Sequence, residues 1–267
     1  MHPPLPAETL LLTGPDAAAF AHAQFSSKVD LLDVGQWQFS AWLDARGRVR
    51  ALFHLARLDQ QRYLLLFRGG GAAAIADALS RFIFRSRLEL TALPRRGLTT
   101  GAAQSMYTVN EHDDVISLGC DTHSLDIATT PPFDAAWRLM QIREGWPWLP
   151  PSSLDAMLPA ALSLQRLHAV VVDKGCYPGQ EIVARLHFRG GHKRHLHRGR
   201  LSQPVAAGET LRMDGQEVGS VLDVVTDGDH LEALLVLNDE VALTADSNPA
   251  CTFDGQSMIT LQAAWPA

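Results

Sequence analysis

The sequence contains, at residues 173–181, the stretch Asp173-Lys174-Gly175-Cys176-Tyr177-Pro178-Gly179-Gln180-Glu181. It places Cys176 just before the expected start of a helix, because Pro178 suits a first helical position, where its missing N–H group costs nothing. Glu181 then falls in the first turn, where the helix dipole favours a negative charge. Unpaired N–H groups and the ammonium group of Lys174 both favour thiolate over thiol. The stretch therefore predicts a reactive cysteine, the alternative being a buried structural one.

The composition is that of an ordinary globular protein. The chain has 267 residues, of which 46% are hydrophobic and 19% charged, so two or three domains with sizeable cores are expected. Cys120, Cys176 and Cys251 are odd in number and far apart, which argues against a disulfide framework and favours a reducing cytoplasm. With no signal peptide and no apolar stretch long enough to span a bilayer, we expect a cytoplasmic protein without a membrane segment.

The hydrophobic patterns divide the chain into mixed and all-β regions. Strands are expected over residues 9–12, 37–43, 49–58, 63–67 and 88–93, and helices over residues 17–25, 72–84 and 134–143. After Gly190-Gly191 the pattern changes to short strands, over residues 196–201, 209–213, 218–225, 231–237 and 258–261. This order predicts layered α+β modules followed by a small β-barrel or sandwich.

Charge is distributed unevenly along the chain. The net charge of −6 argues against a polyanion-binding protein, yet residues 182–200 contain no acid and ten basic or histidine side chains. Such a stretch predicts an anion site. His192, His195 and His197 lack the regular spacing and the cysteine or carboxylate partners typical of zinc sites, so no metal is expected.

The cysteine stretch resembles the signature of the YgfZ family, folate-binding proteins linked to iron–sulfur cluster assembly or repair. This family is related to the aminomethyltransferase (T-protein) of the glycine cleavage system. The resemblance covers most of the chain in the expected order. Its further pieces are Thr13-Gly14, Asp16, Asp44-Ala45-Arg46-Gly47-Arg48, Gly145-Trp146-Pro147, Leu158-Pro159, Leu164, Val183-Ala184-Arg185, Phe188-Arg189-Gly190 and Lys193-Arg194.

The resemblance implies an α+β fold with an aminomethyltransferase-like (GcvT-like) body of two α+β lobes and a small C-terminal β-barrel. One lobe is expected to be discontinuous and ferredoxin-like, with residues 1–50 and 130–194 carrying the signature and the folate site. Residues 51–129 would form the second lobe, and residues 195–267 the barrel.

The resemblance also implies the ligand and the site residues. Tetrahydrofolate or a derivative is the expected cofactor, and iron–sulfur client enzymes or assembly proteins are the expected partners. Direct RNA binding is not expected, and any effect on tRNA modification would be indirect. Cys176 and Lys174 are the expected functional centre. The supporting signature residues are Gly175, Tyr177, Gly179, Gln180 and Glu181. The expected folate contacts are Asp44, Trp42, Glu144, Trp146, Arg185, Arg189 and Arg194.

The main alternative is a folate-dependent aminomethyltransferase. That enzyme carries an acidic pair just after the turn that matches residues 44–48, and here those positions hold Arg50, Ala51 and Leu52. None of these side chains accepts a proton at neutral pH, so an accessory protein is expected rather than a classical enzyme. The family's folate-contacting acid also falls one residue away, at Glu144.

Other chemistries fit the sequence less well. Three scattered cysteines do not supply the four thiolates that iron–sulfur clusters prefer, so no cluster held by this chain alone is expected. Cys176 could ligate or attack a cluster shared with a partner, or act in redox chemistry. A Cys–His hydrolase pair, for example with His168, is not excluded by spacing alone. Gly69-Gly70-Gly71 lacks the spacing of a dinucleotide loop and the lysine of a P-loop.

Overall fold

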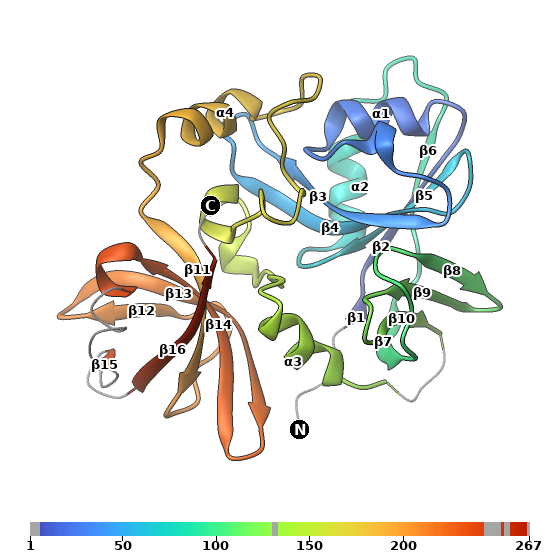
Figure 1. Ribbon diagram of the computed structural model, residues 1–267. Coiled ribbons are helices and arrows are strands. Elements are labelled where there is room, and N and C mark those ends of the chain that lie inside the picture. Colours follow the sequence, from blue (N-terminus) through green and yellow to red (C-terminus); the bar gives the residue numbers. More distant parts are fainter. Residues whose placement is uncertain (1–5, 130–132, 243–251, 254–256, 266–267) are drawn as a thin grey trace.

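The computed structural model describes residues 6–129, 133–242, 252–253 and 257–265 (Figure 1). Three antiparallel sheets, joined by a largely irregular connecting segment, account for most of these residues. The expected α+β class is confirmed. Within the described part of the chain, every helix is too short or too polar to cross a bilayer.

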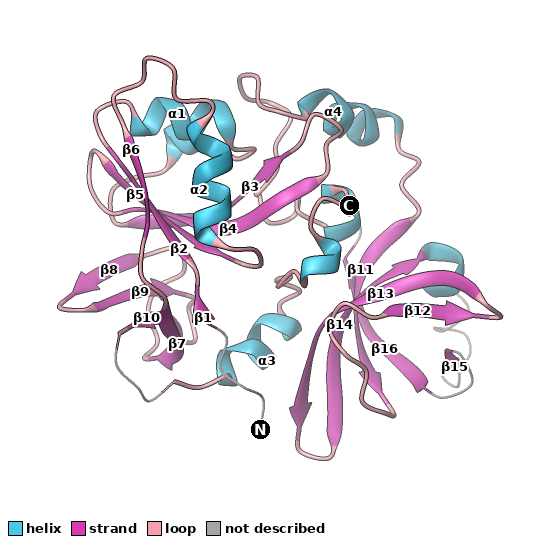
Figure 2. Ribbon diagram, turned by 180° about the vertical axis from the view of Figure 1, so that it is seen from behind, coloured by secondary structure: helices cyan, strands magenta, loops and turns pink. Residues whose placement is uncertain are grey.

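The first sheet has the strand order β3-β4-β5-β2-β6. Its strands are β2 (Thr9–Thr13), β3 (Gln36–Leu43), β4 (Val49–Arg57), β5 (Arg62–Phe67) and β6 (Glu89–Ala92). Helices α1 (Ala17–Gln24) and α2 (Ala72–Ser80) cover one face, as Figure 2 shows. Successive side chains of a strand point to opposite faces of the sheet. One set of alternating residues therefore packs in a core beneath the two helices, and the other set packs in a second core on the opposite face.

The hairpin between β3 and β4 follows from the chemistry of its turn. The Oδ1 atom of Asp44 accepts hydrogen bonds from the backbone N–H groups of Arg46 and Arg48, each at 2.8 Å. Gly47 has a φ of +75°, which other residues adopt only with strain. The turn expected from the sequence is therefore confirmed.

The second sheet has the order β1-β7-β10-β9-β8. Its strands are β1 (Pro6–Ala7), β7 (Arg96–Gly101), β8 (Val109–His112), β9 (Val115–Gly119) and β10 (Ser124–Ala128). Trp37 of β3 joins the two sheets, because its indole N–H donates to the carbonyl of Gly119 at 2.9 Å. The sequence did not predict β7 or β8, because their polar residues give no clear hydrophobic alternation.

A connecting segment follows, with helix α3 (Ala136–Arg143), two short 3₁₀ helices (Pro151–Ser153 and Pro159–Leu162) and helix α4 (Gln180–Arg189). In Figure 1 it passes between the first two sheets and the C-terminal strands. Its tryptophans enter the core shared by all three sheets.

The C-terminal module is a six-stranded sheet with the order β12-β13-β14-β11-β16-β15. Its strands are β11 (Arg194–Leu201), β12 (Thr210–Met213), β13 (Gln216–Asp227), β14 (His230–Asn238), β15 (Thr252–Phe253) and β16 (Ser257–Trp265). The end strands β12 and β15 contact each other, so the sheet curls around its own core. The expected all-β module is confirmed.

The expected domain boundaries do not coincide with the sheets. The boundary between residues 50 and 51 falls inside β4, and the one between residues 194 and 195 falls at the first residue of β11. The first sheet is continuous across the former, because β4 pairs with β3 on one side and β5 on the other. The discontinuous lobe and its boundaries remain predictions.

Candidate functional site

The cysteine lies in a loop before α4 rather than in the first turn of that helix. The helix begins at Gln180, and Gly179 before it has a φ of +79°, so Pro178 is not the first helical residue as expected. The left-handed glycine interrupts the helix, and the N–H group of Gln180 bonds back to the carbonyl of Tyr177 at 3.2 Å. Cys176 is exposed, and Glu181 lies in the first turn as expected.

The turn between β3 and β4 packs directly on the start of α4. A Cβ atom added to Gly179 would lie 2.5 Å from the carbonyl oxygen of Asp44 and 2.8 Å from the Cα atom of Gly47. A Cβ atom added to Gly47 would lie 2.9 Å from the Cβ atom of Ile182. Two motifs that are far apart in the sequence therefore meet backbone to backbone, and only glycines allow this approach.

Replacing Gly179 by alanine tests this contact. We expect Gly179→Ala to lower the free energy of unfolding by about 3 kcal/mol or more, from the left-handed backbone together with the overlap. Gly215→Ala is the matched control, because Gly215 has a φ of +77° and nothing within 4 Å of the added Cβ atom. Urea unfolding measures both values, and equal losses in the two variants would contradict the packing argument.

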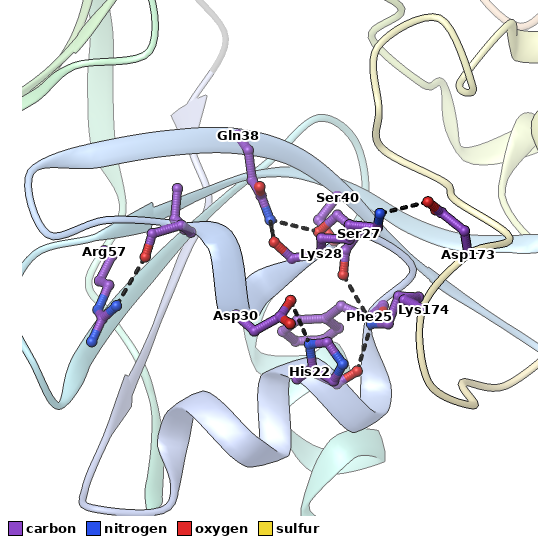
Figure 3. A network of polar contacts seen from close by, with 11 residues as sticks. His22, Phe25, Ser27, Lys28, Asp30, Gln38, Ser40, Arg57, Asp173 and Lys174 are labelled. Carbon is purple, nitrogen blue, oxygen red and sulfur yellow. Dashed lines mark hydrogen bonds and ion pairs between the residues drawn. The ribbon is translucent and has the colours of Figure 1, made fainter.

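Lys174 holds the loop to the first helix (Figure 3). Its ammonium group donates to the carbonyl oxygens of His22 at 2.6 Å, Phe25 at 2.7 Å and Ser27 at 2.8 Å. These carbonyls lie at and just beyond the end of α1, where helix carbonyls lack partners and a cation is favoured. Burial lowers the pKa of Lys174 to about 8.

These contacts limit how Lys174 can bind the thiol of Cys176. An ammonium group has three donors, and main-chain carbonyls use all three. None is left for a hydrogen bond to the thiol of Cys176, so Lys174 fixes the loop that carries the cysteine, and its effect on the thiol stays a prediction.

The other signature residues close the loop on itself. The hydroxyl group of Tyr177 donates to the carbonyl of Val171 at 2.7 Å, and burial raises its pKa. The amide of Gln180 donates to the carbonyl of Lys174 at 3.2 Å. Asp173, just before the lysine, accepts a hydrogen bond from Lys28 at 2.6 Å, which lowers the pKa of that carboxyl. The signature thus builds a defined platform for the exposed Cys176.

The other cysteines differ from Cys176. Cys120 is buried, its thiol donates to the carbonyl of Leu118, and burial raises its pKa to about 12. Cys251 lies outside the described residues.

The expected folate contacts are dispersed rather than gathered in one pocket. Trp42 is buried under α1 and α2, whereas Trp146 lies in the core on the opposite face of the first sheet. The two tryptophans therefore lie on opposite faces of the first sheet, and their part in a folate site stays a prediction. Asp44 is used by its own turn, and Glu144 is exposed just after α3.

The expected basic contacts are also separate. Arg185 and Arg189 are exposed on α4. Arg194 belongs to the C-terminal sheet, where it donates to Asn238 and Glu217, each at 2.9 Å.

A cavity of about 560 Å³ lies where the three sheets meet. The β5–α2 loop, the start of the chain, α3, the segment after Trp146 and the strand β13 all contribute to it. Its lining residues are Pro6, Glu8, Phe67, Gly69, Gly70, Gly71, Arg95, Arg138, Trp148, Leu149, Pro150, Pro151, Ala207, Leu222 and Asp223. Of these residues, the sequence suggested only Trp148, as one of four tryptophans that could line an aromatic slot for folate.

The charges in the cavity wall are paired. Arg138 and Asp223 form a buried ion pair, with Nε and Oδ2 3.3 Å apart. Arg95 contacts Glu8 at 2.5 Å, and the second oxygen of Glu8 accepts the N–H group of Ala72 at the start of α2. Two acids and two arginines thus leave the lining itself without net charge.

Of the histidines before and within β11, His197 lines a separate cavity of about 390 Å³, together with Asp239. His195 contacts Asp239 at 2.6 Å. Burial lowers the pKa of His197 and of His192. Among the described residues, no three His, Cys, Asp or Glu side chains are grouped so as to hold a metal ion.

The chain resembles known proteins over nearly its whole length, although no family model matches it. It is 26% identical to the tRNA-modifying protein YgfZ of Yersinia enterocolitica, over 94% of this chain and 87% of that protein. It is also 26% identical to the protein of the same name from Sodalis glossinidius, over 76% of this chain and 72% of the relative.

A solved structure shares the fold. The glycine cleavage system aminomethyltransferase T from Bartonella henselae superposes with a TM-score of 0.71, at 18% identity, over 96% of this chain and 82% of that chain. The sequence relatives and the shared fold agree with the motifs around Cys176. The sequence relatives support the resemblance to the YgfZ family that the motifs around Cys176 carry, and the solved structure shows that the chain has the fold of a glycine-cleavage aminomethyltransferase.

Proposed function

We propose that this chain is a folate-binding accessory protein in iron–sulfur cluster assembly or repair. A reduced folate would occupy the cavity between the three sheets, and Cys176 would carry the thiol chemistry. The observation that supports the proposal most directly is the cavity itself, which combines aromatic, glycine and arginine residues. Its volume of about 560 Å³ falls within the ordinary range for sites of small organic ligands.

The cavity chemistry suits a flat ring with an acidic tail. Trp148 and Phe67 offer apolar surface for a pterin ring. Glu8 and Asp223 offer carboxylates that can accept its N–H groups, and Arg95 and Arg138 offer guanidinium groups for the carboxylates of the tail. Each of these charged groups already has a partner in the protein, which holds it in position for a ligand.

The thiol is a separate part of the proposed function. No residue of the loop around Cys176 is among those that line the cavity in the described chain. An exposed thiolate can ligate iron, and one thiolate needs further ligands from a partner. Cys176 would thus act on a cluster shared with a client or assembly protein. An influence on tRNA modification, suggested by the names of the relatives, would then be indirect.

The positions of the transferase acids argue against aminomethyl transfer. Ala51 and Leu52 are fully buried, and Arg50 contacts Asp155 at 3.3 Å and stacks on Trp42. None of them supplies a proton acceptor beside a ligand. General acid–base assistance accelerates a reaction about 10²–10⁴-fold, and a chain without the acid lacks this acceleration. Aminomethyltransferase activity is therefore not part of the proposal.

A titration with 5-formyltetrahydrofolate tests the folate site. Ligand that binds only the native state raises the melting temperature by mass action, and saturation at about 100 times Kd adds about 2.7 kcal/mol. We expect Trp148→Leu to weaken binding by about tenfold, since aromatic pairs contribute about 0.5–1.5 kcal/mol beyond area burial. Arg212→Ala is the control, because Arg212 is exposed on β12 and lies outside the cavity lining. No shift at millimolar ligand would overturn the folate assignment.

A further inference from the structure

Arg68 is a fully buried cation immediately behind the cavity wall. It follows β5, between the lining residues Phe67 and Gly69. Its guanidinium donates from Nε to the carbonyl of Pro147 at 2.8 Å and from Nη2 to the carbonyl of Trp146 at 2.9 Å. Such complete burial of an arginine is rare unless an acid accompanies it.

The third contact of Arg68 is a histidine. Its Nη1 atom lies 2.6 Å from Nε2 of His54, which is also fully buried. Burial and the charge of Arg68 together lower the pKa of His54 well below its usual value, so the imidazole is neutral and Nε2 accepts. Burial lowers the pKa of Arg68 to about 9, so the guanidinium remains charged at neutral pH.

The positive charge of Arg68 has no ion-pair partner in the described part of the chain. Two acidic groups act on its pKa: the Cys120 thiol, which burial keeps protonated by raising its pKa to about 12, and Asp223, which is already paired with Arg138. The lining pairs cancel each other, so Arg68 gives the surroundings of the cavity one net positive charge. A charge in a dry interior is screened far less by water and salt than a charge at the surface.

Trp148 connects this charge to the cavity. The centre of the guanidinium lies 4.9 Å from the centroid of the Trp148 ring, and the same tryptophan lines the cavity. Trp137, with its ring centroid 5.0 Å away, supports the indole from a further side. The aromatic wall of the cavity is thus backed by a fixed cation that solvent does not reach.

We propose that Arg68 sets the charge preference of the cavity, so that the cavity selects anionic aromatic ligands over neutral aromatic ligands of the same shape. Arg68 need not touch the ligand, because its field acts through the Trp148 ring. The identity of the natural ligand rests on the proposed function, but the preference for an anion rests on the geometry of Arg68 alone. An acidic folate is one ligand of this class.

Two dyes that share one skeleton test the inference without folate. 8-Anilinonaphthalene-1-sulfonate is anionic, and N-phenyl-1-naphthylamine is its neutral counterpart. We expect Arg68→Met to reduce the ratio of the two affinities, anionic dye over neutral dye, by about tenfold. Arg68→Lys should retain this ratio. In the unsubstituted protein the ratio should change little between 0.1 and 1 M salt, because the charge is buried. Arg68→Gln, whose amide can still donate to a carbonyl, replaces the methionine variant if that variant does not fold.

Ala207→Trp identifies binding in the cavity, because Ala207 is an exposed residue of its lining. The inference would be overturned if Ala207→Trp left dye binding unchanged. It would also be overturned if loss of the Arg68 charge left the affinity ratio of the two dyes unchanged. A parallel titration compares 5-formyltetrahydrofolate with neutral tetrahydrobiopterin. If neither pterin binds while the dyes show the Arg68-dependent preference, the folate proposal fails and the inference stands.

Discussion

Iodoacetamide labels Cys176 in the native protein at least ~10³-fold faster than Cys120, because only the former presents an accessible thiol. At pH 8, a pKa of about 12 leaves about one Cys120 thiol in ten thousand ionised. Burial adds to the difference, since the reagent reaches Cys120 only when its surroundings open. Mass spectrometry of labelled peptides measures the two rates residue by residue.

The same reaction in concentrated urea supplies the control. There both cysteines should react at rates within a few-fold of each other, since neither keeps its folded surroundings. Native rates that differ by less than tenfold would show that the platform around Cys176 does not present the thiol as described. A cell that depends on the protein gives the functional counterpart, in which we expect Cys176→Ala to fail while the purified variant still binds folate.

Lys174→Met has the second large effect, and we expect it to lower the free energy of unfolding by about 2–3 kcal/mol. The substitution removes the ammonium group from three carbonyls, and hydrogen bonds to charged groups contribute about 1.5–3 kcal/mol each. Burial of the ammonium group, which lowers the pKa of Lys174, offsets much of this sum. Because the loop loses its anchor on α1, hydrogen exchange of residues 171–179 should also accelerate. Urea unfolding and exchange mass spectrometry measure the two effects.

Lys28→Met is the matched control for this prediction. Lys28 contacts Asp173 at 2.6 Å in the same network (Figure 3), but the carboxylate is largely exposed. Exposed pairs contribute about 0–1 kcal/mol, so the control should lose little stability and leave exchange in the loop nearly unchanged. Equal losses in Lys174→Met and Lys28→Met would contradict the anchoring role of Lys174.

The sequence predicted local features well where one short stretch contains all the determinants. The hairpin turn at Asp44 and Gly47 and the exposure of the signature cysteine are of this kind. The start of α4 was misplaced by two residues, because Pro178 and Gly179 are both acceptable near a helix start and tertiary packing decides between them. The backbone contact between Gly47 and Gly179 fixes that choice.

Long-range placement could not be read from residue types. Trp42 and Trp146 are equally apolar, and only the strand alternation and the path of the connecting segment put them on opposite faces of a sheet. The three carbonyls that bind Lys174 belong to the main chain and leave no trace in the sequence. The cavity was missed for a related reason, since its lining comes from segments that meet only in the folded chain.

The anchoring of Lys174 on His22, 152 positions earlier in the chain, has a consequence for biosynthesis. A ribosome makes the residues of the first helix long before it reaches the cysteine, so the segment that Lys174 binds is already synthesised when the thiol emerges. The loop therefore acquires its final shape by docking on an element already made, and a truncated chain without that helix would carry the thiol on an unanchored segment. The anchored form of the loop, and not exposure of the thiol by itself, therefore depends on the folded N-terminal segment.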